Sequence, residues 1–344
     1  AGARGSMEPA PGGAAARDGT LQLFKDFYLR HPDPRLQCAE WHWGNLEAAN
    51  STISIRSAEE VERYRRENGL NVAVLRGERR MPKPFQSFRE TSFPQWVKDL
   101  AYELFTADAK PFAAQAQAWP CALSGMDLVV VAPTGSGKTL AYLLPALVHI
   151  MAQPHLERGQ GPIAVVLVPT RELARQTHEV AKRFCERTAG EDTLRTGVAF
   201  GGVDPAVQLP KEDPPDNGRW PEILVATSRR LLRLVHESHL RLSRTSYLVV
   251  DEADLLLAPS PGPDTMSDIL ALSHPDRQML IISATWSPQL EAVALKLCGD
   301  ELVKIQVFPE VPPIPQEVRL FIGADEPEAR RDALLEWLRR DRSP

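Results

Sequence analysis

The sequence predicts an α/β domain in which helices cover both faces of a mostly parallel β-sheet. Short apolar segments rich in Val, Ile and Leu recur at 127–132, 163–168, 195–200, 222–226, 247–250, 278–282 and 302–307. Amphipathic, helix-like segments such as 171–187 and 288–297 separate most of them. Strands that are apolar along their whole length are buried on both faces, which is typical of parallel sheets. Because these strands alternate with helices, we expect three layers, α/β/α.

The composition is that of a globular protein. Of the 344 residues, 43% are hydrophobic and 25% are charged, and the formal net charge is -5. This length suits one large domain or two smaller ones. A negative net charge argues against a protein that coats nucleic acid by bulk charge, although it leaves local basic contacts open. No apolar run approaches the roughly 18 residues of a membrane span, so we expect no membrane association.

The cysteine pattern bears on the cellular compartment. No two of the cysteines have the close spacing of a zinc site or a redox pair, and they are Cys38, Cys121, Cys185 and Cys298. Scattered cysteines favour reduced thiols. We therefore expect an intracellular protein, in the nucleus or the cytoplasm.

The regions before the alternating segments differ from them in composition. Residues 1–20 begin with a stretch that resembles a cloning tag, ahead of Met7, and continue with Gly, Ala and Pro. We expect a tag and a disordered tail, because this composition cannot build a core. Residues 21–80 are expected to form a flanking extension, and residues 81–307 the α/β domain.

Two proline-rich stretches interrupt or follow the predicted domain. Residues 203–222 are too polar for a regular element, which predicts a surface insertion. Residues 308–316 predict a stiff linker, and after it come a strand-like EVRLFI and a helix-like segment, 326–340. We expect 308–344 to be this linker and the truncated start of a second domain. The insertion, the flank and the tail are the predicted protein-binding surfaces.

A glycine-rich turn, APTGSGKT, joins the first apolar segment to a helix-like segment. Its backbone N–H groups can wrap a phosphate chain, because glycine lets the main chain approach closely and the helix N-terminus adds partial positive charge. Lys138 is expected to neutralise the β and γ phosphates, and the Thr139 hydroxyl to bind Mg²⁺. The alternative is a flexible Gly/Ser turn, which the flanking strand and helix disfavour. The predicted nucleotide contacts are Thr134, Gly135, Ser136, Gly137, Lys138 and Thr139.

An acidic pair stands at the end of a later apolar segment, in SYLVVDEADLLL. Ligands of open α/β sheets collect at the carboxyl ends of strands. Asp251 can hold Mg²⁺, and Glu252 can orient or deprotonate the attacking water. A solvated acidic loop is the alternative. The predicted catalytic residues are therefore Lys138, Asp251 and Glu252.

Taken together, these motifs resemble the first RecA-like domain of a DEAD-box RNA helicase. Asp251–Asp254 reads DEAD, and APTGSGKT, PTRELA at 169–174 and SAT at 283–285 follow the order of that family. The resemblance runs from about residue 80 to 307. It implies a RecA-like fold, ATP and Mg²⁺ as cofactors, RNA as a partner, and RNA-stimulated ATP hydrolysis that unwinds duplexes or remodels ribonucleoproteins.

The resemblance extends, with departures, to the segment that recognises adenine in the family. A glutamine amide can pair with adenine N6 and N7, and an aromatic ring can stack on the base, which is worth about 1–3 kcal/mol. Gln115 is the predicted amide and Phe88 the predicted stacking ring. The family usually has Pro-Thr-x-Ile-Gln, whereas this chain has PFAAQ at 111–115. Core packing is the alternative for Phe88.

Backbone contacts with RNA are implied at three further segments, because an unwinding enzyme must tolerate any sequence. The residues are Pro169, Thr170, Arg171, Gly201, Gly202, Thr227 and Arg230. The family motif Thr-Pro-Gly-Arg is TSRR here, so Arg229 replaces a glycine. This arginine can crowd the path of the strand, add a phosphate contact, or lie on a solvated helix face together with Arg230 and Arg233.

The last implied feature couples the two sites. Ser283 and Thr285 carry short hydroxyls that can bond a carboxylate, and the resemblance makes Asp254 the partner. A plain helix N-cap is the alternative, and both can hold at once.

The chain has no HRxGRxGR stretch, which in the family supplies arginine fingers worth about 10³–10⁵ in rate. We therefore expect this chain alone to bind ATP or ADP weakly, to hydrolyse ATP very slowly and to unwind nothing. Two rival functions remain at this point. One is an RNA-clamping scaffold with a degenerate ATPase, and the other is a motor directed at DNA or at proteins.

Overall fold

The computed structural model describes residues 56–91, 93–104, 109–153, 155–188, 194–208, 220–257 and 262–308. All of them lie in the compact unit Ala1–Pro309. The predicted tag and tail at 1–20, most of the flanking extension, and the linker and second-domain start after Phe308 lie outside the described residues.

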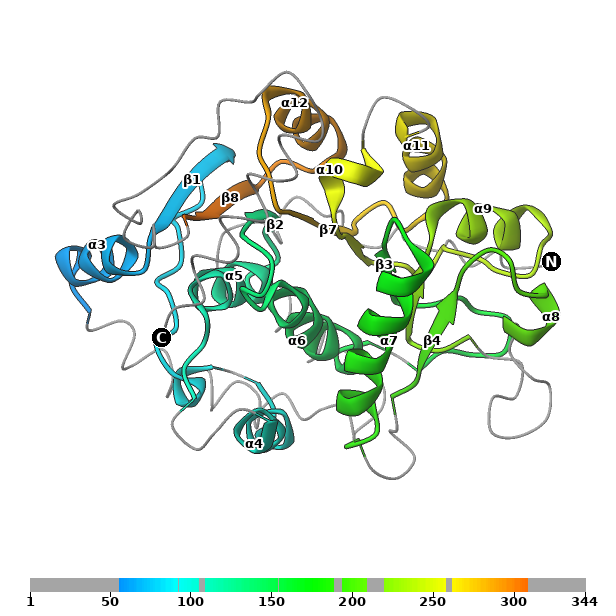
Figure 1. The fold of residues 1–344 in the computed structure, drawn as a ribbon, viewed down its shortest axis with the longest axis horizontal. Helices are drawn as coiled ribbons and strands as arrows, with labels where there is room; N and C mark the ends of the chain where they lie inside the picture. Colours follow the sequence, from blue (N-terminus) through cyan, green and yellow to red (C-terminus); the bar gives the residue numbers. More distant parts are fainter. Residues whose placement is uncertain are drawn as a thin grey trace, which may run out of the picture. The chain divides into compact units, whose positions relative to one another are not determined.

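Within these residues, an 8-stranded sheet forms the centre of the fold (Figure 1). Its spatial order is β1-β8-β2-β7-β6-β3-β5-β4. All neighbouring strands pair in parallel except β1, which runs antiparallel to β8. Every apolar segment predicted from the sequence forms a strand, so the mostly parallel sheet is confirmed. The strands are β1 Leu70–Arg76, β2 Asp127–Val131, β3 Ala164–Leu167, β4 Thr196–Ala199, β5 Ile223–Ala226, β6 Tyr247–Val250, β7 Gln278–Ser283 and β8 Leu302–Val307.

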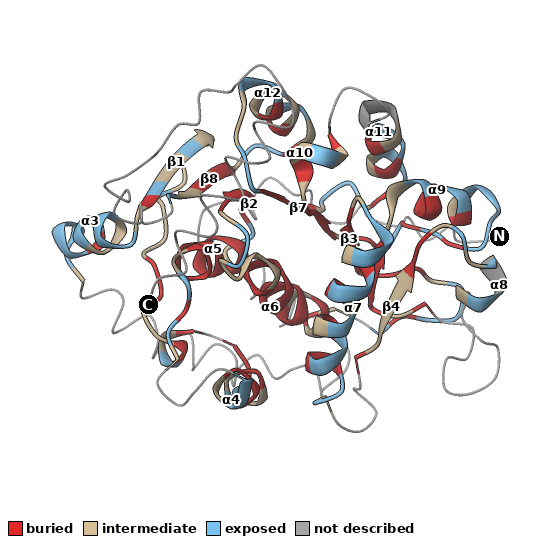
Figure 2. Ribbon diagram, in the orientation of Figure 1, coloured by how far each residue is buried: buried red, intermediate tan, exposed pale blue. Residues whose placement is uncertain are grey.

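Successive side chains of the buried strands enter two different cores. In β2, Leu128 and Val130 belong to one cluster, which also contains side chains of α4, α5, α6 and α7. Val129 and Val131 belong to the other, with side chains of α9, α11 and α12. Figure 2 shows the central strands and helices α5 and α6 largely buried, whereas α3, α7 and α12 have exposed sides. The predicted three layers are therefore confirmed.

Some of the helices begin at a serine or threonine that caps them. Thr170 accepts a hydrogen bond from the Leu173 amide at 3.2 Å to start α7, and Ser287 does the same for Leu290 in α12. Helix α3 precedes β1, and the other helices lie in the connections between successive strands. The helices are α3 Ala58–Glu67, α4 Gln95–Leu104, α5 Ala113–Leu123, α6 Lys138–Met151, α7 Arg171–Cys185, α8 Pro205–Gln208, α9 Ser228–His236, α10 Ala253–Leu256, α11 Gly262–Leu272 and α12 Pro288–Leu297, with a 3₁₀ turn at Phe88–Glu90.

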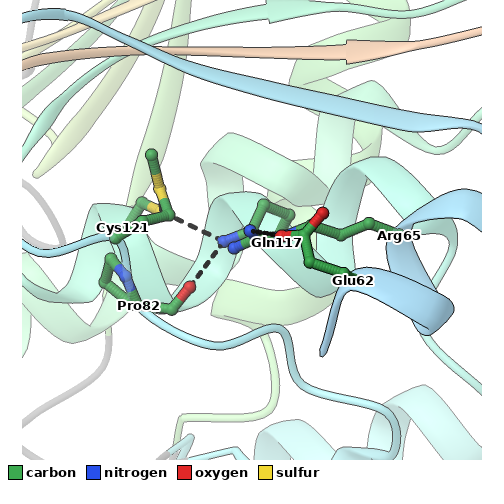
Figure 3. Close-up of polar contacts among 6 residues, drawn as sticks. Glu62, Arg65, Pro82, Gln117 and Cys121 are labelled. Carbon is green, nitrogen blue, oxygen red and sulfur yellow. Dashed lines mark hydrogen bonds and ion pairs between the residues drawn. The ribbon is translucent and has the colours of Figure 1, made fainter. Parts of the chain in front are cut away.

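The described end of the flanking extension belongs to the folded domain. Strand β1 adds an antiparallel edge, so the sheet already begins inside the stretch 21–80. Helix α3 is held to α5 by Arg65, whose Nε donates to Gln117 Oε1 at 3.1 Å (Figure 3). Gln117 in turn donates to the Pro82 carbonyl at 2.9 Å and contacts Cys121. The flank is therefore built into the packing beneath helix α5.

The proline-rich stretch 203–222 departs from the prediction at one point. Pro205–Gln208 forms the short helix α8, because a proline can start a helix whose first N–H needs no partner, and residues 209–219 lie outside the described residues. Cys121, Cys185 and Cys298 are free and buried. Among the described helices, none combines the length and the hydrophobicity needed to cross a bilayer.

Candidate functional site

The segments singled out in the sequence converge on one edge of the sheet. Apart from the predicted adenine segment, each follows the carboxyl end of a parallel strand, and such ends meet at the same edge. The glycine-rich loop follows β2, the acidic segment follows β6, and the SAT segment ends β7, which pairs with both of those strands. Strands β3, β4 and β5 bring the remaining segments to the neighbouring half of the edge.

The loop between β2 and α6 has the backbone of a phosphate cradle. Gly135 and Gly137 have φ values of 79° and 75°, a backbone conformation that residues other than glycine rarely adopt. A Cβ at Gly137 would lie 2.3 Å from Gln115 Nε2, whereas one at Gly135 would meet nothing within 4 Å. The first glycine of this pair therefore borders open space, and the second lets α5 approach the loop.

Lys138, at the start of α6, is folded back onto this loop. Its Nζ donates to the carbonyl oxygens of Ala132 at 2.8 Å and Pro133 at 3.3 Å. Ser136 Oγ donates to the same Pro133 carbonyl at 2.7 Å. The ammonium group therefore lies at the loop but is engaged with main-chain oxygens, and it must exchange these bonds to reach a phosphate.

Asp251 follows β6 and is only 4% exposed. Its Oδ2 accepts a hydrogen bond from the Tyr142 hydroxyl, and its Oδ1 accepts one from the Glu252 amide, both at 2.9 Å. Burial raises the pKa of Asp251, while these two hydrogen bonds and the charge of Lys138 act to lower it. The carboxylate is thus fixed in one orientation by neutral donors, with no basic side chain bonded to it within the described residues.

Glu252 stands between Asp251 and helix α10 in a left-handed conformation, with φ 49° and ψ 52°. This region is sparsely populated by residues other than glycine, asparagine and aspartate, and strain of this kind costs roughly 1–3 kcal/mol. Such strain clusters at functional sites. Here it directs the glutamate away from the path that a regular helix start would give it.

The predicted adenine amide, Gln115, is 2% exposed and lies against the loop. Its Oε1 accepts from the Phe112 amide, and its Nε2 donates to the Gly137 carbonyl, both at 3.0 Å. The side chain therefore joins the start of α5 to the phosphate loop. Its role with adenine stays a prediction.

The predicted stacking ring has a different setting. Phe88 is 2% exposed and packs on Tyr102 and Trp119, with ring centroids 5.7 and 5.4 Å apart. This is the core packing that was the alternative for this residue. Phe112, which sequence reasoning treated only as a departure from the family pattern, is 49% exposed. A Cβ at Gly137 would lie 2.8 Å from its ring, so Phe112 borders the loop.

The residues predicted for RNA contact line one groove of about 830 Å³. They come from segments after β3, β4 and β5, which the sheet order places side by side. Sequence reasoning missed its other wall, which is formed by Leu255 and Leu256 of α10 and Met266 of α11. The predicted residues in the lining are Pro169, Thr170, Arg171, Gly201, Gly202, Thr227 and Arg230, and Arg229 and Arg233 join them.

Guanidinium groups dominate the polar side of this groove. Arg230 is 4% exposed, and its Nε donates to Gln208 Oε1 at 2.9 Å. Its Nη2 is buried and finds no hydrogen-bond partner in the described part of the chain. Arg171 packs against Gly202, where φ is 84°. Arg229 is exposed, with no ion pair within the described residues, whereas Arg233 pairs with Glu237 at 2.7 Å.

The SAT segment forms part of the predicted coupling contact. Thr285 Oγ1 donates to Asp254 Oδ2 at 2.9 Å. Ser283 is fully buried and accepts from the Thr285 amide at 3.2 Å, while its carbonyl accepts from Ala132 N at 3.1 Å. The threonine therefore makes the carboxylate bond, and the serine joins the segment to the start of the phosphate loop.

This arrangement defines the class of P-loop nucleotide-binding domains: a glycine cradle at a helix N-terminus with an acidic strand end beside it. The comparison with protein families then identifies the particular one. The DEAD/DEAH box helicase model matches residues 112–293, more than half of the chain, and the chain belongs to this family. The sequence resemblance to DEAD-box proteins is thereby confirmed.

Relatives and solved structures agree with this assignment. ATP-dependent RNA helicase DBP2 of Mycosarcoma maydis is 41% identical over 258 residues, covering 75% of this chain and 43% of that protein. DEAD-box ATP-dependent RNA helicase 20 of Oryza sativa subsp. japonica is 38% identical over 288 residues, 83% of this chain and 51% of that one. The chain thus spans about half the length of these relatives. The ADP-bound crystal structure of the RNA-helicase Prp28 from Chaetomium thermophilum aligns with TM-score 0.62 and 27% identity over 84% of this chain and 64% of that one.

Proposed function

We propose that this chain supplies the nucleotide-binding and RNA-binding domain of an ATP-dependent RNA helicase that unwinds or remodels RNA. One observation carries the proposal. Helix α10 begins next to the acidic pair, and its last two residues, Leu255 and Leu256, form a wall of the arginine-lined groove. A single helical turn therefore joins the carboxylates expected to act on ATP to the groove expected to hold RNA.

The site fits a nucleotide with its metal ion. Asp251 and Thr139 offer hard oxygen ligands, and Gly135 borders open space over the loop. Mg²⁺ keeps several waters and binds through one or two carboxylates plus substrate phosphates. No cluster of three or more His, Cys, Asp and Glu side chains in the described part of the chain could hold a metal. This favours a metal that arrives with the phosphates, where it would neutralise charge on them.

The protein groups then have distinct tasks. Lys138 turns from the loop carbonyls to the phosphates, and Gln115 keeps α5 against the cradle. Glu252 orients the attacking water. The bond from Thr285 to Asp254 joins the acidic segment to β7. A movement of the acidic segment at the phosphates would therefore also shift α10. In the groove, Arg171, Arg229 and Arg230 contact phosphates, which gives binding without sequence preference. Nuclear or cytoplasmic location stays a prediction.

The test of nucleotide binding compares ATP, ADP and GTP on the wild type, Lys138→Ala and Lys182→Ala, by calorimetry. Lys182 is an exposed lysine of α7 that pairs with Glu186 at 3.7 Å, and it serves as the matched control. We expect ATP and ADP to bind more tightly than GTP. Lys138→Ala should weaken binding roughly 10- to 150-fold, the value of a charge-assisted contact. Absence of ADP binding by the wild type, or equal binding by both lysine variants, would overturn the proposal.

A further inference from the structure

Tyr142 bonds the carboxylate expected to hold the metal, although no sequence motif points to it. It lies on α6, one helical turn after Lys138, and it is fully buried. Its hydroxyl donates to Asp251 Oδ2 at 2.9 Å. The other oxygen of Asp251 accepts from the Glu252 amide. The phenol therefore sets the rotation of a carboxylate that has no other side-chain donor within the described residues.

Threonines of α6 itself and of one further helix, α7, act on the same phenol. Burial and the charge of Asp251 raise the pKa of Tyr142, and hydrogen bonding from the side chains of Thr177 and Thr139 acts in the opposite direction. Thr177 belongs to α7, and Thr139 is the residue expected to place its hydroxyl on Mg²⁺. Tyr142 thus bonds one of the two residues that the proposed function assigns to the metal, and it lies three positions after the other, Thr139, on the same helix.

Another buried tyrosine shows what a purely structural phenol does in this fold. Tyr247, also fully buried, donates its hydroxyl to the Tyr142 main-chain carbonyl at 2.9 Å. That bond satisfies a main-chain carbonyl and does not involve a carboxylate. Tyr142 instead donates its hydroxyl hydrogen bond to a buried carboxylate, whose Oδ2 has no other hydrogen-bond donor within the described residues. A hydrogen bond to a charged group corresponds to roughly 10- to 150-fold in an equilibrium constant.

We propose that Tyr142 is a positioning residue of the magnesium–nucleotide site, which holds Asp251 in the orientation that accepts the metal. The inference rests on the proposed function. It acts through Asp251 and requires no contact between the phenol and the nucleotide. Loss of the hydroxyl frees the carboxylate to rotate, so that metal-assisted binding weakens while the contacts of the phosphate loop remain.

The experiment measures ADP affinity by calorimetry, once in Mg²⁺ and once in EDTA, for the wild type, Tyr142→Phe and Tyr247→Phe. We expect the wild type and Tyr247→Phe to bind ADP more tightly in Mg²⁺. In EDTA, the ADP affinity of Tyr142→Phe should stay within about twofold of the wild type. The ratio of its affinity in Mg²⁺ to its affinity in EDTA should be about 10-fold smaller than that of the wild type. If Tyr142→Phe does not fold, Tyr142→4-fluorophenylalanine fills the hydroxyl's volume without a donor and carries the same expectation.

The outcomes separate the two proposals. If the wild type binds no ADP in either condition, the proposed function fails and this inference fails with it. If the wild type gains affinity from Mg²⁺ and Tyr142→Phe gains equally, only the role of Tyr142 is contradicted. A matching loss in Tyr247→Phe would also overturn it, because a general effect of losing a buried hydroxyl would then explain the result.

Discussion

The nucleotide half and the groove half of this site differ in how their polar groups are satisfied. At the phosphate loop, Lys138, Gln115 and Asp251 each bond to other groups of the protein. In the groove, Arg230 keeps a buried nitrogen without a partner, and Arg229 has no ion pair among the described residues. The first half must therefore exchange existing bonds when a ligand arrives. The second presents the exposed guanidinium of Arg229, while the buried Arg230 must shift before it can reach a ligand.

This difference bears on what limits the affinity for each of the two ligands. A buried donor without a partner costs about 1–3 kcal/mol, and a phosphate oxygen would remove that penalty once the Arg230 side chain shifts toward the groove. At the loop, a phosphate must instead compete with the two carbonyls that hold Lys138. We expect nucleotide affinity to be limited by this rearrangement and RNA affinity to be limited mainly by salt.

The largest expected effect comes from the one side chain that breaks this pattern in the nucleotide half. The carboxylate of Glu252 has no bonding partner within the described residues, and its backbone is left-handed. In the intact protein, Glu252→Gln should lower RNA-stimulated ATPase about 10²–10⁴-fold, the value of a general base, with nucleotide affinity little changed. Steady-state ATPase assays check this, with the exposed Asp268→Asn of α11 as the control. Equal rates would contradict the proposed enzyme and favour a clamp without hydrolysis.

The second prediction separates two phenylalanines of the nucleotide half. Phe88→Ala should destabilise the fold by about 3–5 kcal/mol, because it removes a buried ring packed on Trp119. Phe112→Ala should leave stability nearly unchanged and weaken ADP binding by about 1–3 kcal/mol, as expected for an exposed ring that stacks on a base. Urea unfolding and calorimetry measure the two effects. If Phe88→Ala kept normal stability and bound ADP more weakly, the prediction would be wrong and Phe88 would be the ring that stacks on the base.

These two rings also show how far the sequence could predict the structure. The loop and the acidic pair were predictable, because parallel strands buried on both faces are apolar and end at a common edge. Which aromatic ring faces solvent depends on tertiary packing, and no local pattern encodes it. Strand β1 was missed for a related reason. It is antiparallel and half exposed, and its partner β8 lies at the other end of the domain's sequence. The buried guanidinium of Arg230 likewise depends on Gln208 of α8, inside a stretch expected to lack regular structure.

The last prediction concerns the arginines of the groove, where the smallest effects are expected. Arg230→Gln should weaken binding of single-stranded RNA by about 1.5–3 kcal/mol if the buried side chain shifts and gives its unpaired nitrogen to a phosphate. Arg229→Gly restores the family residue and should weaken binding less, since an exposed side chain keeps much of its hydration. Arg183→Ala, an exposed arginine near the far end of α7, is the matched control.

The salt dependence of these variants decides what Arg229 does. If it contacts a phosphate, Arg229→Gly should reduce the slope of log K against log salt by about 0.7, the value for one contact with a single strand. If it crowds the path of the strand instead, the variant should bind RNA more tightly with an unchanged slope. We expect the first result, because Arg229 lines the groove beside Thr227 and Arg230 and has no competing carboxylate partner within the described residues. A tighter Arg229→Gly would mean that the exposed guanidinium obstructs the groove, and the contrast between the two halves would then rest on Arg230 alone.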